Sequence, residues 1–132
     1  HLEDLRKAAH IASVTGAEDI GQGAIVCHGL VLCVEAQEGT DQMLRRCAQL
    51  DEILRGTRTH PRGVLVKRPK PQQERRIDLP TVGHETLVRV SEAGLSGIGI
   101  EAGGALLLGG DALIQRAEEL GLFIYGFPKD WS

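Results

Sequence analysis

A chain of 132 residues has the length of one domain, and its 42% hydrophobic and 25% charged residues are ordinary globular values. Its net charge of −3 argues against a general nucleic-acid-binding protein, and its longest apolar run, residues 24–36, is too short to cross a bilayer. The three cysteines form no CxxC pair and are odd in number, which argues against a disulfide framework and favours core packing in a cytosolic protein.

Helical and strand-like patterns alternate along the chain. Residues 1–18 are predicted to be a first helix or a linker from a missing upstream domain, and residues 19–132 the domain itself. Two apolar runs around His28 and Gly29 predict a hairpin. Apolar spacing predicts three more helices, over residues 41–55, 84–93 and 112–120. A final apolar run predicts a strand over residues 122–126.

Expected capping residues mark the ends of these three helices. Thr40 and Asp111 are expected as N-caps, because their side-chain oxygens accept hydrogen bonds from free backbone N–H groups. A glycine follows each helix and is suited to the left-handed C-terminal cap, namely Gly56, Gly94 and Gly121.

Three strand-like segments recur at similar spacing. They end at Glu35, Lys67 and Glu101, so that 32 and then 34 residues separate their ends. This is the length of a strand, a helix and two loops. The predicted fold class is therefore α/β: a mostly parallel or mixed sheet from three strand–helix units, helices packed on it, and an N-terminal hairpin. Glu35, Lys67 and Glu101 are expected at the same sheet edge, where ligands bind in such folds.

An acidic segment precedes the second predicted helix. Glu35, Glu38 and Asp41 flank a Gly-Thr step, and carboxylates this close together can bind Mg²⁺ while substrate phosphates complete the coordination shell. The helix N-terminus also offers N–H groups to an anion. The alternative is that Asp41 only favours the helix dipole and the glutamates are solvated.

A polar, proline-interrupted segment runs from Lys67 to Gly83. Its first ten residues carry five basic residues and one acid, and a loop of this length inside a domain is often functional. Arg75 and Arg76 can contact phosphate oxygens, and Asp78 beside them is a candidate metal ligand or water-orienting base. Thr81 opens the next helix. The alternative is an Asp–Arg pair that only fastens the loop.

The glycines after Glu101 also have two interpretations, because they can admit a ligand or form only a tight turn.

Four ordered motifs together resemble a known family. They are EAQEGTDQMLRR at 35–46, VLVKRPKPQQERRIDLPTVG at 64–83, GIGIEAG at 97–103 and GLFIYG at 121–126. In these motifs the chain resembles the carboxy-terminal half of the LpxI-type UDP-2,3-diacylglucosamine pyrophosphatases, which certain Gram-negative bacteria use in lipid A synthesis. The resemblance runs from about Asp19 to Gly126.

The resemblance implies a cytosolic enzyme at the inner-membrane surface. It would hydrolyse UDP-2,3-diacylglucosamine to UMP and 2,3-diacylglucosamine 1-phosphate with Mg²⁺. Asp78 matches the family's catalytic aspartate, and Glu38 and Asp41 match its acidic segment and are expected as metal ligands. The residues expected to bind substrate or phosphate are Thr40, Lys67, Lys70, Arg75, Arg76, Thr81 and Glu101.

The resemblance also implies partners and leaves one alternative. Family members carry an amino-terminal domain, with the lipid substrate between the two domains, so the isolated chain is expected to fold but to hydrolyse substrate poorly. A homodimer is a further expectation, and no nucleic-acid partner is expected. The alternative is a non-catalytic nucleotide- or phospholigand-binding regulatory domain, which would tolerate the loss of Asp78.

Overall fold

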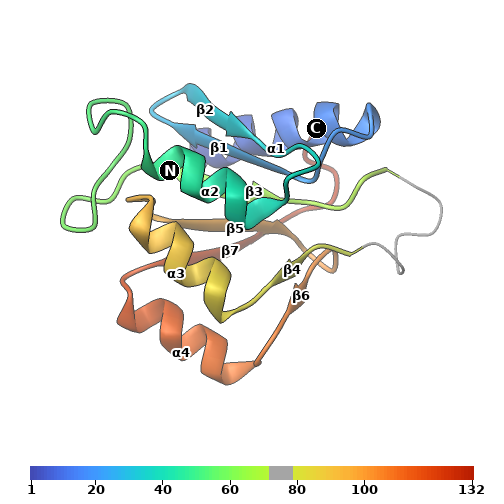
Figure 1. Ribbon diagram of the computed structural model, residues 1–132. Coiled ribbons are helices and arrows are strands. Elements are labelled where there is room, and N and C mark those ends of the chain that lie inside the picture. The colour runs from blue at the N-terminus through green and yellow to red at the C-terminus, as the bar shows by residue number, and fades with distance from the viewer. Residues whose placement is uncertain (72–78) are drawn as a thin grey trace.

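The computed structural model describes residues 1–71 and 79–132 as a sheet covered by helices on both faces (Figure 1). Arg75, Arg76 and Asp78 lie outside the described residues. The described helices are α1 (Leu2–Ala17), α2 (Thr40–Ala48), α3 (His84–Glu92) and α4 (Asp111–Glu119). The described strands are β1 (Gly23–Cys27), β2 (Leu30–Val34), β3 (Val64–Lys67), β4 (Thr81–Val82), β5 (Gly97–Glu101), β6 (Leu106–Leu107) and β7 (Phe123–Phe127).

The main sheet has the order β2-β1-β3-β5-β7. β3, β5 and β7 are parallel to one another, whereas β1 runs antiparallel to both β2 and β3. The predicted α/β class and the N-terminal hairpin are therefore confirmed. The hairpin turn has positive φ at His28 and Gly29, and Asp4 of α1 accepts hydrogen bonds from both of their N–H groups at 2.9 Å.

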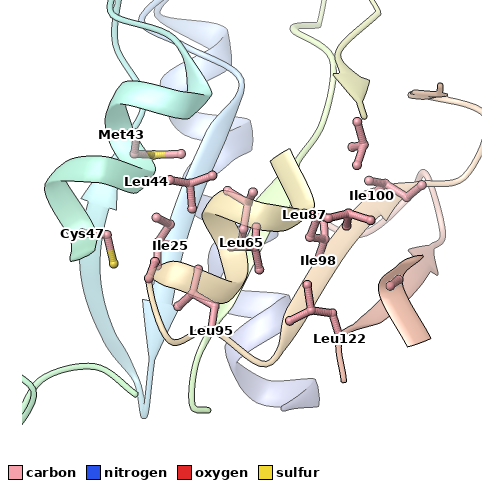
Figure 2. Packing of buried hydrophobic residues seen from close by; sticks show 14 of the residues in the cluster. Ile25, Met43, Leu44, Cys47, Leu65, Leu87, Leu95, Ile98, Ile100 and Leu122 are labelled. Carbon is pink, nitrogen blue, oxygen red and sulfur yellow. The ribbon is translucent and has the colours of Figure 1, made fainter. Parts of the chain in front are cut away.

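Alternate side chains of the sheet enter two separate apolar clusters, because successive residues of a strand point to opposite faces. On one face Ile25, Leu65 and Ile98 pack under α2, α3 and α4, as Figure 2 shows. On the other face Val26 and Val66 pack under α1. The cysteines are free and buried, as their apolar setting predicted. None of the described helices is both long and apolar enough to span a membrane.

The second predicted helix is shorter than its apolar spacing suggested. α2 ends at Ala48, and Ile53 and Leu54, which continue the spacing, are 80% and 38% exposed. Gly56 is not a helix cap. A Cβ added there would lie 2.3 Å from the Gly94 carbonyl oxygen, so this glycine allows two backbone segments to touch. Gly94 and Gly121 do follow their helices with φ of 76° and 70°, as predicted.

Two predicted N-caps lie one residue inside their helices. Thr40 and Asp111 are the first helical residues of α2 and α4, and the N-caps are Gly39 and Gly110. Both glycines have positive φ, 88° and 54°, which a glycine adopts without steric cost and a threonine or aspartate does not. Thr40 is thereby released from capping and binds a neighbouring carboxylate instead, as described below.

Two short strands lie where no strand was predicted. Thr81, expected at the start of the next helix, lies in β4, and α3 begins at His84. β4 pairs with β6 in parallel, with Thr81 opposite Leu106 and Val82 opposite Leu107. Each strand has only two residues, which is too short to produce a detectable alternation. This small sheet lies beside the carboxyl ends of β3 and β5 (Figure 1) and brings residues 79–82 back to the sheet edge.

Candidate functional site

Glu35, Lys67 and Glu101 lie at the same edge of the main sheet, as their recurrence predicted. β3 and β5 are parallel, with Lys67 opposite Ile100. β2 has the same direction as β3, because each is antiparallel to β1, and the Glu35 N–H donates to the Gly23 carbonyl oxygen at 2.9 Å, next to Lys67. β1 separates β2 from β3, so these two strands share an edge without being neighbours.

The three side chains nevertheless divide between the two faces of the sheet. Leu65 and Cys33 belong to the cluster under α2–α4. Lys67 comes two residues after Leu65, and Glu35 comes two residues after Cys33, so both point to this same face. In β5 the residues that enter this cluster are Ile98 and Ile100, so Glu101 points toward α1. The edge therefore carries two sites rather than one.

The first site is a depression of about 450 Å³ between the start of α2 and β4. Five residues predicted from the sequence line it, along with three neighbours. The predicted residues are Glu38, Thr40, Asp41, Lys67 and Thr81, and the neighbours are Gly39, Gln42 and Thr86. Residues from three distant segments of the chain thus meet at one concave surface, as expected of a ligand site in an α/β sheet.

Lys67 forms the buried wall of this depression. It is 6% exposed, and its Nζ donates a hydrogen bond to the Thr81 carbonyl oxygen at 2.8 Å. Burial lowers the pKa of the Lys67 ammonium, and the carboxylates of Glu35 and Asp41 act in the opposite direction. An ammonium has three N–H groups, so one can tie β3 to β4 while others remain for a ligand.

Glu35 holds the start of α2 in place. Its carboxylate is buried and accepts hydrogen bonds from the Gln22 N–H at 3.0 Å and from the Thr40 hydroxyl. The Thr40 side chain is therefore turned toward Glu35, and its backbone stands at the positive end of α2. Glu35 was predicted as part of the acidic segment, and its hydrogen bonds to Gln22 and Thr40 show that it fixes this segment in place.

The two predicted metal ligands differ in their surroundings. Glu38 forms an ion pair with Arg46, whose Nε donates to it at 3.0 Å and whose Nη2 also reaches the Val34 carbonyl oxygen at 3.1 Å. Asp41 lies in the first turn of α2 and interacts electrostatically with Lys67 and Arg89. Within residues 1–71 and 79–132, no three His, Cys, Asp or Glu side chains cluster closely enough to hold a metal by themselves.

The second site, on the α1 face, centres on Arg68, which sequence reasoning did not single out. Arg68 is 5% exposed and donates to Glu101 Oε1 from Nη2 at 2.9 Å and from Nε at 3.3 Å. Its other bonds go to the carbonyl oxygens of Ala9 at 3.1 Å, Trp131 at 2.9 Å and Lys129 at 3.2 Å. Arg68 thus joins β3, β5, α1 and the carboxy-terminal residues.

Two other predicted ligand residues are placed away from the depression. Glu101 is 2% exposed and ion-paired with Arg68, and its assignment to the substrate stays a prediction. Lys70 lies near the end of α1, where its Nζ contacts Asp19 at 2.7 Å. Arg75, Arg76 and Asp78 remain predictions, because they fall within 72–78.

Another depression, of about 540 Å³, lies at the start of α1. It is lined by His1, Leu2, Glu3, Asp4, Lys7, His28 and Gly29. Asp4 is already engaged by the hairpin turn. The depression at the start of α1 contains none of the motif residues. We therefore take the depression beside Lys67 as the candidate site.

The sequence has recognisable relatives. The model of the family described as LpxI C-terminal domain matches residues 1–125. The chain is also 55% identical over 126 residues to a protein of Caulobacter vibrioides named UDP-2,3-diacylglucosamine pyrophosphatase LpxI. That alignment covers 96% of this chain and 45% of the relative, so the chain spans just under half of the relative's length.

Proposed function

The chain belongs to the LpxI C-terminal domain family, and from this premise we propose that it is the carboxy-terminal domain of a UDP-2,3-diacylglucosamine pyrophosphatase. The reaction adds water to one phosphorus of the diphosphate and breaks a phosphorus–oxygen bond of the bridge. It releases UMP and 2,3-diacylglucosamine 1-phosphate, an intermediate of lipid A biosynthesis. The relative's name supports the substrate, and the depression beside Lys67 supports the chemistry.

The meeting of a buried lysine with a helix N-terminus in one depression is the observation that carries this proposal. Phosphate groups carry negative charge, and both the Lys67 ammonium and the exposed N–H groups at the start of α2 favour it. Because the lysine is buried, its charge is screened less by water than a surface charge would be. The depression therefore offers a preorganised environment for a diphosphate.

Mg²⁺ is proposed as the cofactor because the donor set at this depression suits it. Mg²⁺ is usually held by one or two carboxylates, with waters and substrate phosphates as the remaining ligands. Among the residues that the structure describes, Asp41 lines the depression without a hydrogen-bonded arginine, and Glu38 is adjacent but paired with Arg46. When bound, the ion would neutralise charge on the phosphates. Lys67 would orient the diphosphate, and Glu35 would keep the start of α2 in position.

Asp78 is proposed as the catalytic residue on the basis of its family motif. It stands three residues before Thr81, which lines the depression. In this role its carboxylate orients the attacking water or contributes to metal binding, and Arg75 and Arg76 contact phosphate oxygens. We further propose that the whole protein acts in the cytoplasm at the inner membrane, since its substrate is a lipid.

The proposal is tested with the full-length protein and UDP-2,3-diacylglucosamine, with release of UMP followed by chromatography. We expect metal-dependent release of UMP by the wild type and a strong loss for Asp78→Asn. Asp51→Asn is the matched control, because Asp51 lies at the opposite sheet edge and an asparagine there can still accept from the Ile53 N–H. Binding of the substrate without release of UMP by the wild type would instead favour the regulatory phospholigand-binding domain.

A further inference from the structure

Three consecutive leucines stand exposed beside the depression. Leu106, Leu107 and Leu108 are 49%, 36% and 55% exposed, although leucine side chains are usually buried. Leu106 and Leu107 form β6, and the Leu108 N–H continues the pairing by donating to the Val82 carbonyl oxygen at 2.9 Å. Their backbone is thus anchored while their side chains face outward. An exposed apolar cluster at a ligand site is a candidate recognition surface.

The leucines are joined to the depression through β4. Thr81 lines the depression, accepts the hydrogen bond of Lys67 and lies directly opposite Leu106 in the small sheet. Paired strands lie about 4.8 Å apart, so the apolar surface begins one strand spacing from the depression wall. A Cβ at Gly83, the N-cap of α3, would lie 3.7 Å from Leu108, which shows how this leucine extends the surface over the start of α3.

We infer that Leu106, Leu107 and Leu108 contact an acyl chain of the substrate and determine its chain-length preference. This inference rests on the proposed function. In UDP-2,3-diacylglucosamine the diphosphate and the two acyl groups are attached to three consecutive carbons of one sugar ring, carbons 1, 2 and 3. A diphosphate held by Lys67 and the start of α2 therefore places the first carbons of the acyl chains close to the depression. The leucines are the exposed large apolar cluster next to it among the described residues.

The test compares the full-length wild type with Leu106→Ser/Leu108→Ser on two substrates at constant detergent concentration. One is UDP-2,3-diacylglucosamine with long acyl chains, and the other is the same compound with two-carbon acyl groups. Ile53→Ser is the matched control, because Ile53 is 80% exposed and lies in the loop that leads into β3 at the opposite edge. The melting temperature of each variant is measured as a control for folding.

We expect kcat/KM for the long-chain substrate to fall about tenfold or more in the double variant, because lost apolar contacts lower affinity for the methylenes they touch. For the short-chain substrate kcat/KM should stay within about twofold. An equal loss on both substrates would overturn the inference and indicate that the leucines pack against the rest of the protein. No loss on either substrate would also overturn the inference. If the double variant does not fold, Leu106→Gln and Leu108→Gln are compared in the same way. Failure of the wild type to cleave either substrate would refute the proposed function and this inference with it.

Discussion

Replacing Arg68 by methionine should destabilise the domain more than any surface substitution. Methionine keeps much of the side-chain volume but removes the guanidinium from its five hydrogen bonds. Glu101 is 2% exposed, and removing one member of a buried ion pair costs about 3–5 kcal/mol. For a domain of this size such a loss corresponds to a fall in melting temperature of about 10–20 °C.

The assay is urea unfolding of the 132-residue chain, followed by circular dichroism, with thermal unfolding alongside. Arg116→Met is the matched control, because Arg116 is partly exposed and pairs with Glu119 at 3.2 Å on the surface of α4. Exposed pairs of this kind contribute about 0.3–0.5 kcal/mol. The double variant Arg68→Met/Glu101→Leu should recover part of the loss, because no buried carboxylate is left behind.

A loss below about 1 kcal/mol for Arg68→Met would refute this reasoning, since it lies under the range for breaking a buried pair. It would mean that water or another cation replaces the guanidinium. If Arg68→Met retains its stability but loses turnover, the Arg68–Glu101 pair would instead belong to the substrate site, as was predicted for Glu101. The two roles are therefore separable by measuring unfolding of the 132-residue chain and hydrolysis by the full-length protein, each carrying the same substitution.

Four further predictions concern the proposed reaction. Asp78→Asn in the full-length protein should lower kcat about 10²–10⁴-fold with little change in substrate affinity, as measured by steady-state kinetics and calorimetry. Exhaustive chelation should abolish hydrolysis, and addition of Mg²⁺ should restore it; undiminished turnover would remove the metal. The isolated 132-residue chain should unfold cooperatively but hydrolyse substrate far more slowly than the full-length protein, and equal rates would contradict this. Lys67→Met should lower kcat/KM about 100-fold or more without destabilising the domain.

The α/β architecture was predictable because each strand is a short apolar run and the runs recur at the length of a strand–helix unit. The division of the sheet edge into two sites was less visible. Alternation shows which way a strand faces only where its side chains differ, and β5 contains Gly97 and Gly99. These glycines have no side chain, so the sequence does not reveal that Glu101 faces α1 rather than Lys67.

The role of Arg68 could not be predicted from local sequence. Its partners are 33, 59, 61 and 63 residues away, at Glu101, Ala9, Lys129 and Trp131. Lys67 and Arg68 look alike as consecutive basic residues, yet they occupy opposite faces because neighbouring residues alternate. Three of the residues predicted to bind phosphate, Thr40, Lys67 and Thr81, line the depression, although Thr40 directs its hydroxyl to Glu35. Their contact with a phosphate stays a prediction.

The prediction for Lys67 follows from two opposite effects of its charge, which favours the binding of an anion but is costly to bury in the folded state. Burial lowers the pKa of Lys67 below its usual value of 10.5, so the folded state holds this proton less tightly than the unfolded state. Below the folded-state pKa both states are protonated, and the native state bears the full cost of a buried charge.

Between the folded-state pKa and 10.5 the unfolded chain binds the proton and the native state does not, so stability rises with pH in this range. Lys67→Met removes the cost, although it leaves the Thr81 carbonyl without this donor. We therefore expect Lys67→Met to be no less stable than the wild type at pH 7, with free energies of unfolding that differ by about 1 kcal/mol or less. As the pH rises toward 10, the free energy of unfolding of the wild type should increase relative to that of Lys67→Met. Urea unfolding of both proteins at pH 7 and pH 10 measures this difference, and a wild-type advantage that shrinks with rising pH would refute the assignment of Lys67 as a buried cation retained for anion binding.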